Sequence, residues 1–179
     1  FSRVKTFFDE DIVAHVSMAR PVSKSLSQCC KAGLKKLNIP HQNNGTYVVM
    51  EGPQFSTLAE SNLYRSWNAD VIGMTNMPEA KLAREAEIRY CTVAMVTDYD
   101  CWHPDHSEVD VSMVIKTLTK NASNAQNLIK EVIKSFKNFS AERELTNTCL
   151  DAAIITDTKF RKKKTIKKLK YIAGRVLNK

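Results

Sequence analysis

Three short apolar runs, separated by two amphipathic runs, dominate residues 47–102 of this chain. The apolar runs are Y-V-V-M at 47–50, D-V-I-G-M at 70–74 and T-V-A-M-V at 92–96, and polar, acidic or Gly/Pro-rich residues follow each of them. Strands that alternate with helices in this way are typical of a mostly parallel sheet. Because ligands bind beyond the carboxyl ends of such strands, we expect the site at residues 51–56, 74–79 and 98–100.

The periodicity of the whole chain predicts an α/β fold with three layers, in which a mixed or mostly parallel central sheet is flanked by helices. We expect strands at 46–50, 70–74 and 90–96, with a further strand within 12–18. Helices are expected at 23–38, 57–67, 78–87, 110–136 and 139–157, and the helical period is strongest in 110–136.

The net charge of +8 belongs to the end of the chain. Residues 151–179 contain ten Lys/Arg and two Asp/Glu, whereas the first 150 residues contain 17 of each sign. We therefore divide the chain into a core domain at 1–138 and a helical, basic C-terminal extension at 139–179. Such a charge run is usually a solvated face or mobile tail, so nucleic-acid or anionic-surface binding is the minority interpretation, with one aromatic residue, Tyr171, in the run.

Cysteine spacing and hydropathy limit the classes of protein to which this chain can belong. The five cysteines include no C-x-x-C pair, which predicts reduced thiols in a cytoplasmic or nuclear protein and no zinc site. His103 and His106 are too few for a metal site. No apolar run approaches the about 20 residues that a membrane span needs. The first residue is Phe1 rather than Met, and we expect that a piece precedes it.

Asp98 and Asp100 are the strongest candidates for chemistry. They are two residues apart at an expected strand end, so both side chains should leave the same face while Tyr99 points away. Two carboxylates that share a half-closed pocket repel each other, and one of them can keep or share a proton. Without further information, a pair of exposed carboxylates at a strand end is the alternative interpretation.

Four motifs carry a family resemblance. E-G-P-Q-F-S at 51–56, A-E-S at 59–61, A-D-V-I-G-M-T-N-M-P-E at 69–79 and T-D-Y-D-C-W at 97–102 occur in the order and spacing of the trimeric purine nucleoside phosphorylase family. Within that family they most resemble the methylthioadenosine phosphorylases. The resemblance covers roughly the first 135 residues, and it implies that 1–138 is the C-terminal portion of a nucleoside phosphorylase domain.

This resemblance implies phosphorolysis of a purine nucleoside, with inorganic phosphate as co-substrate and no metal or organic cofactor. Phosphate attacks the anomeric carbon, and the products are a free base and a sugar 1-phosphate. Asp98 would contact the purine N7, and Asp100 would accept a hydrogen bond from the exocyclic amine. Ser56 and Asp98 are the adenine-type residues at two positions that differ in relatives acting on 6-oxopurines.

The resemblance also assigns further contacts, each with core packing or capping as its alternative. Tyr99 is counted among the substrate contacts, Met74 would lie against the ribose, and the Thr75 hydroxyl would help to bind phosphate. Phe55 would cover the base. The methylthio pocket would be lined by Val111, Val114 and Ile115. The sugar would also be contacted by His15 from a neighbouring subunit of a homotrimer.

The sequence also departs from the family pattern. This sequence lacks three phosphate-binding features of the family's upstream half: the glycine-rich loop, the Arg-His pair and a further Thr. In addition, Arg20 stands where the family has an acidic residue, and Gln54 stands where methylthioadenosine phosphorylases usually have an arginine. Three functions stay open: phosphorolysis of S-methyl-5'-thioadenosine, binding of adenine nucleosides or joining of trimers without turnover, and phosphorolysis of another purine nucleoside.

Overall fold

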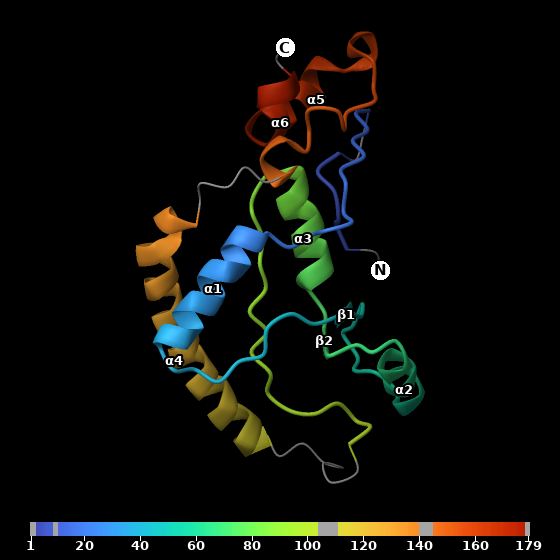
Figure 1. Ribbon diagram of the computed structural model, residues 1–179. Coiled ribbons are helices and arrows are strands. Elements are labelled where there is room, and N and C mark those ends of the chain that lie inside the picture. The colour runs from blue at the N-terminus through green and yellow to red at the C-terminus, as the bar shows by residue number, and fades with distance from the viewer. Residues whose placement is uncertain (1–2, 9–10, 104–110, 140–144, 178–179) are drawn as a thin grey trace. The chain divides into compact units, whose positions relative to one another are not determined.

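The computed structural model describes residues 3–8, 11–103, 111–139 and 145–177, and only the backbone of 111–114 (Figure 1). The chain forms two compact units. Unit 1 comprises residues 1–27, 77–92 and 140–179, and unit 2 comprises residues 28–76 and 93–139. No helix among the described residues is long and apolar enough to cross a lipid bilayer.

A parallel strand pair forms the sheet of unit 2. β1 (Tyr47–Val49) pairs with β2 (Val71–Gly73), with Tyr47 opposite Val71, and Met50 N donates to Gly73 O at 2.9 Å. Helix α2 (Leu58–Ser66) connects the two strands. A parallel pair needs such a crossover, and the result is that the segments after β1 and β2 leave the same edge of the sheet.

Two helices pack together in the rest of unit 2. α1 (Lys24–Lys36), apart from its first turn, lies against α4 (Val111–Ser135), which continues into the 3-10 turn η1 (Phe136–Asn138). Gly33 permits the close approach, because a β-carbon there would lie 2.9 Å from Leu128 Cδ1. The Cys29 thiol donates to Val132 O at 3.7 Å, and Lys36 Nζ pairs with Glu131 at 2.5 Å.

Unit 1 has its own apolar core, to which the basic C-terminal residues belong. It contains nearly all of α3 (Asn76–Glu85), the 3-10 turns η2 (Leu145–Thr148) and η3 (Thr158–Phe160), and the helices α5 (Lys163–Lys168) and α6 (Lys170–Leu177). The buried members of the core are Phe8, Ile12, Leu150, Ala153, Leu169, Ala173 and Leu177. The last five come from the extension predicted at 139–179, which therefore packs in part into this core.

The α/β class and the parallel pairing are confirmed, as are the helices expected at 23–38, 57–67, 78–87 and 110–136, within a few residues at their ends. The strand predicted at 90–96 is wrong: the segment has no strand assignment, and the sheet has two strands among the described residues. A strand exists only through ladder hydrogen bonds to a neighbour, which its own sequence does not supply.

The helix predicted at 139–157 is also wrong for its described part. Residues 145–157 contain η2 followed by turns, in which Asp151 N donates to Thr148 O at 3.1 Å and Ala153 N to Leu150 O at 3.3 Å. Thr and Asn in L-T-N-T are weak helix formers. The strand within 12–18 is reduced to one antiparallel bridge between Ala14 and Ile154. The division at residue 138 stays a prediction.

Candidate active site

The segments that follow β1 and β2 touch each other at the edge predicted for the site. Gly52 has a φ of +66°, and a β-carbon on it would lie 2.6 Å from Met74 Sδ. Only glycine adopts this conformation without strain, so G-P in E-G-P-Q-F-S is explained by a turn pressed against Met74. The loop after β1 therefore lies in contact with Met74, directly after β2.

A second contact brings the aspartate loop to the same place. Cys101 Sγ donates to the backbone O of Ser56 at 3.6 Å. Cys101 directly follows Asp100, so this contact brings the loop at 97–103 next to the end of E-G-P-Q-F-S. Ser56 itself is half-buried, and its hydroxyl donates to Met50 Sδ at 3.4 Å.

The two carboxylates are held by their own loop. Asp98 is exposed, and its Oδ1 accepts a hydrogen bond from the hydroxyl of Thr97. Asp100 is half-buried; its Oδ1 accepts from Cys101 N at 2.8 Å, and its backbone O accepts from His103 N at 3.1 Å. These short-range bonds orient both side chains within one turn, and each carboxylate has a second oxygen with which to accept from a ligand.

An aromatic cluster surrounds this turn. The Tyr99 ring stacks on His103 with centroids 4.4 Å apart and meets the edge of Trp102 at 6.1 Å. The guanidinium of Arg65, at the end of α2, lies 3.9 Å from the Trp102 ring. This cation–π contact ties the aspartate loop to α2. The sequence did not predict the contact of Arg65 with Trp102 or the stacking of Tyr99 on His103, although the aromatic residues of D-Y-D-C-W-H at 98–103 were a visible signal.

Several predicted apolar contacts are exposed in this chain. Phe55 is 87% exposed and Ile115 is 58% exposed. Core packing, the alternative interpretation of both residues, does not hold here. Their roles over the base and at the methylthio group stay predictions.

The remaining predicted residues are placed as follows. Met74 is half-buried and Thr75 is exposed beside it. His15 is exposed in unit 1, where its backbone N donates to Ala153 O at 2.8 Å. The side chains of Val111 and Val114 lie outside the described part of the chain.

A capping box fixes the start of α2 behind the site loop. The backbone N–H and hydroxyl of Thr57 donate to the Glu60 carboxylate at 2.7 and 2.8 Å, and Glu60 N donates back to Thr57 Oγ1 at 3.3 Å. The bond from the Thr57 N–H, followed by that from its hydroxyl, lowers the pKa of Glu60 below its ordinary value. No group of three or more His, Cys, Asp or Glu side chains that could hold a metal ion occurs in the described ranges.

Comparison with known proteins identifies the family of this chain. The sequence profile of the "Phosphorylase superfamily" matches residues 1–134. The chain belongs to this superfamily. It is 56% identical over 178 residues to S-methyl-5'-thioadenosine phosphorylase of Rhodospirillum rubrum, with 99% of this chain and 60% of the relative covered. It is 51% identical over 176 residues to the enzyme of that name from a Synechocystis strain, covering 97% and 54%.

Solved structures give the same family. A methylthioadenosine phosphorylase from an antarctic soil metagenomic library superposes with a TM-score of 0.87 at 43% identity, covering 95% of this chain and 60% of that one. The Schistosoma mansoni methylthioadenosine phosphorylase in complex with adenine superposes with a TM-score of 0.75 at 25% identity, covering 87% and 62%. The chain thus spans about 60% of the length of the relatives it matches.

Proposed function

We propose that this protein catalyses phosphorolysis of S-methyl-5'-thioadenosine to adenine and 5-methylthioribose 1-phosphate. The observation that carries the proposal is the 56% identity to a protein of that name over nearly the whole chain. The contacts of Gly52 with Met74 and of Cys101 with Ser56 support it, because they bring three separate motifs to one surface.

The carboxylates account for the choice of base. An ionised carboxylate only accepts hydrogen bonds, so Asp100 suits the 6-amino group of adenine and opposes the oxygen of a 6-oxopurine. Asp98 serves the departing base at N7, where negative charge develops as the glycosidic bond breaks. A group that keeps or shares a proton there would neutralise this charge.

The sugar and phosphate ends of the site follow the same assignment. Met74 packs against the ribose, Thr75 donates its hydroxyl to phosphate, and Phe55 and Tyr99 offer aromatic faces to the base. Ile115, with Val111 and Val114, offers an apolar surface to the methylthio group. In a homotrimer, His15 of a neighbouring copy completes the sugar site.

The cellular setting is part of the same proposal. All five cysteines are free thiols, which favours a reducing compartment, and we place the protein in the cytoplasm of the cell, where purine and methionine salvage occur. A nuclear location stays a prediction without support here.

One observation favours a second candidate function. Among the proposed site residues, only Thr75 is assigned to phosphate. A chain that carries the adenine and ribose surface without the anion-binding groups would bind adenine nucleosides, or join trimers, without turnover.

Release of free base by the purified 179-residue protein tests these functions. The assay measures adenine from S-methyl-5'-thioadenosine and hypoxanthine from inosine, each with and without inorganic phosphate. We expect phosphate-dependent adenine release and little hypoxanthine. Release of hypoxanthine at a comparable rate would show a phosphorylase of different base preference. Binding of the nucleoside in calorimetry without release of adenine would show the non-catalytic function.

A further inference from the structure

The lysines of residues 159–170 form a cationic surface on unit 1, which we call the basic surface. Eight of these twelve residues are Lys or Arg, and the seven lysines among them are exposed. Lys159 and Lys162 each approach one carboxylate, at 3.8 and 3.7 Å. Lys163, Lys164 and Lys167 have no carboxylate partner in the described part of the chain. Most of the protein's excess positive charge is therefore concentrated in this segment, and at least these three lysines have no carboxylate beside them in the described ranges.

The basic surface has a fixed scaffold. Thr165, Leu169, Ala173 and Leu177 are buried and recur every four residues along α5 and α6, where the last three join the core of unit 1. Lys167, Lys168 and Lys170 lie between these buried positions, and the other four lysines precede Thr165. Because the apolar side of these helices already faces the core, it is not available for insertion into a lipid surface, which requires an exposed apolar face.

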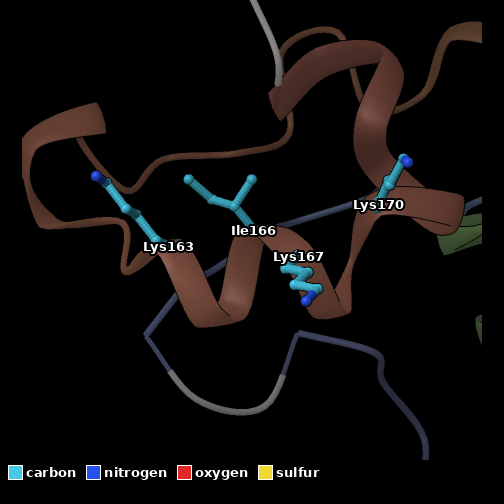
Figure 2. Close-up of a pocket in the computed structure, with 4 residues that line it drawn as sticks. All are labelled: Lys163, Ile166, Lys167 and Lys170. Carbon is cyan, nitrogen blue, oxygen red and sulfur yellow. The ribbon is translucent and has the colours of Figure 1, made fainter.

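The spacing of the ammonium groups suits an extended anion. Lys163, Ile166, Lys167 and Lys170 line an open hollow of about 230 Å³. Figure 2 shows the three lysine side chains spread along α5 and the start of α6, with their nitrogens pointing away from one another. Such an arrangement contacts several phosphates of one strand better than it encloses a single phosphate ion.

Exposed aromatic rings lie at both ends of the basic surface. Phe160 is 65% exposed, and Lys159 Nζ lies 4.9 Å from its ring centroid. Tyr171 is 90% exposed, and Lys170 Nζ lies 5.6 Å from its ring. Exposed rings beside cations are the elements on which unpaired bases stack in proteins that bind single strands. Phe160 adds a second aromatic residue to the one that the sequence indicated.

We propose that the basic surface binds single-stranded nucleic acid, with the lysines on the phosphates and with Phe160 and Tyr171 stacking on unpaired bases. This activity is separate from the nucleoside site. It requires only unit 1 residues, and it does not depend on turnover of any nucleoside.

Fluorescence anisotropy of a labelled oligouridylate, titrated with the full 179-residue protein at several salt concentrations, tests the proposal. The charge variant is Lys163→Gln, Lys164→Gln and Lys167→Gln together. Its matched control is Lys116→Gln, Lys120→Gln and Lys130→Gln, which removes three exposed lysines of α4 and gives the same net charge. The stacking variant is Phe160→Ala with Tyr171→Ala, whose rings are exposed and should not be needed for folding.

We expect the charge variant to reduce the slope of log affinity against log salt by about 2, as for the loss of three phosphate contacts on a single strand. The α4 control should keep the wild-type slope. The stacking variant, which removes two rings, should bind at least about thirtyfold more weakly and keep the slope. Equal slopes for the charge variant and the control would overturn the proposal, as would an unchanged affinity of the stacking variant. Binding to phosphatidylserine vesicles but not to the oligonucleotide would overturn it in favour of a lipid surface.

Discussion

Gly52 lies directly against the sulfur of Met74, so that a β-carbon on Gly52 would be 2.6 Å from Met74 Sδ. The Gly52→Ala variant should therefore be destabilised. The left-handed backbone of Gly52 alone costs a non-glycine residue about 1–2 kcal/mol, and displacement of the Met74 side chain adds to this. Chemical denaturation of the purified protein measures the change.

The control for this change is Gly174→Ala within α6. Alanine is preferred to glycine inside helices, and this variant should be more stable by about 0.5–1 kcal/mol. If Gly52→Ala unfolds at the same denaturant concentration as the wild type, the tight contact between the two loops does not exist in solution.

The capping box at Thr57 and Glu60 predicts a stability effect on α2. Thr57→Ala removes the acceptor for Glu60 N and should cost about 1 kcal/mol, whereas Thr57→Ser should retain most of the stability. Thermal unfolding of the two variants at neutral pH measures the difference. Equal midpoints for the alanine and serine variants would contradict the observed cap.

The same cap predicts that the free energy of unfolding depends on pH in the acid range. Hydrogen bonds from Thr57 lower the pKa of Glu60 below its ordinary value of 4.5, so the folded state favours the ionised form. This contribution is complete above pH 4.5 and is lost as the pH falls through the lowered folded pKa. The stability difference between the wild type and Glu60→Gln should accordingly shrink at acid pH, and a difference that grows on acidification would be inconsistent with the bond.

The environment of Cys149 predicts that the free energy of unfolding falls as the pH rises in the alkaline range. Burial, together with the nearby Glu87 carboxylate, raises the pKa of the Cys149 thiol above its ordinary value of 9.0, and the thiol donates to Arg84 O at 3.0 Å. The neutral thiol therefore stabilises the folded state below pH 9, and this contribution is lost as the pH rises through the raised pKa. Unfolding curves of the wild type and Cys149→Ala should converge above pH 9.

Thiol labelling gives an independent measurement of the same environment. Cys101 is exposed, whereas Cys149 is half-buried and Cys29 is fully buried. A chromogenic disulfide reagent at pH 8 should label Cys101 before Cys149, and Cys29 last, as followed by mass spectrometry. Faster labelling of Cys149 than of Cys101 would show that the core of unit 1 is open in solution.

The sequence predicted the parts of the fold that depend on local patterning. The periodicity around α1 and α4 identified both helices, and the three apolar runs identified β1 and β2 with the crossover between them. The predicted strand at 90–96 failed because pairing depends on a neighbour elsewhere in the chain. The sequence also did not predict that Leu169 and Leu177 share a core with Ile12, because an apolar period does not specify which distant segment will cover it.

For the site, too, the sequence predicted the local features but not the contacts between separate loops. The motifs indicated which loops carry Asp100 and Ser56, and the parallel pairing of β1 and β2 indicated the sheet edge at which the loop with Ser56 begins. The contact of Cys101 with Ser56 and the placement of Arg65 on Trp102 depend on the paths of separate loops, which no local pattern specifies.

Base preference at Asp100 tests the central claim most directly, and it requires no turnover. Titration calorimetry compares adenine with hypoxanthine on the wild type, on Asp100→Asn and on the control Asp157→Asn, an exposed aspartate of unit 1 whose side chain accepts a hydrogen bond from Lys159 N. We predict that the wild type and the control bind adenine at least about tenfold more tightly, and that Asp100→Asn loses this preference because its amide can donate to a 6-oxo group. Equal binding of the two bases by the wild type, or an unchanged preference in Asp100→Asn, would contradict the account.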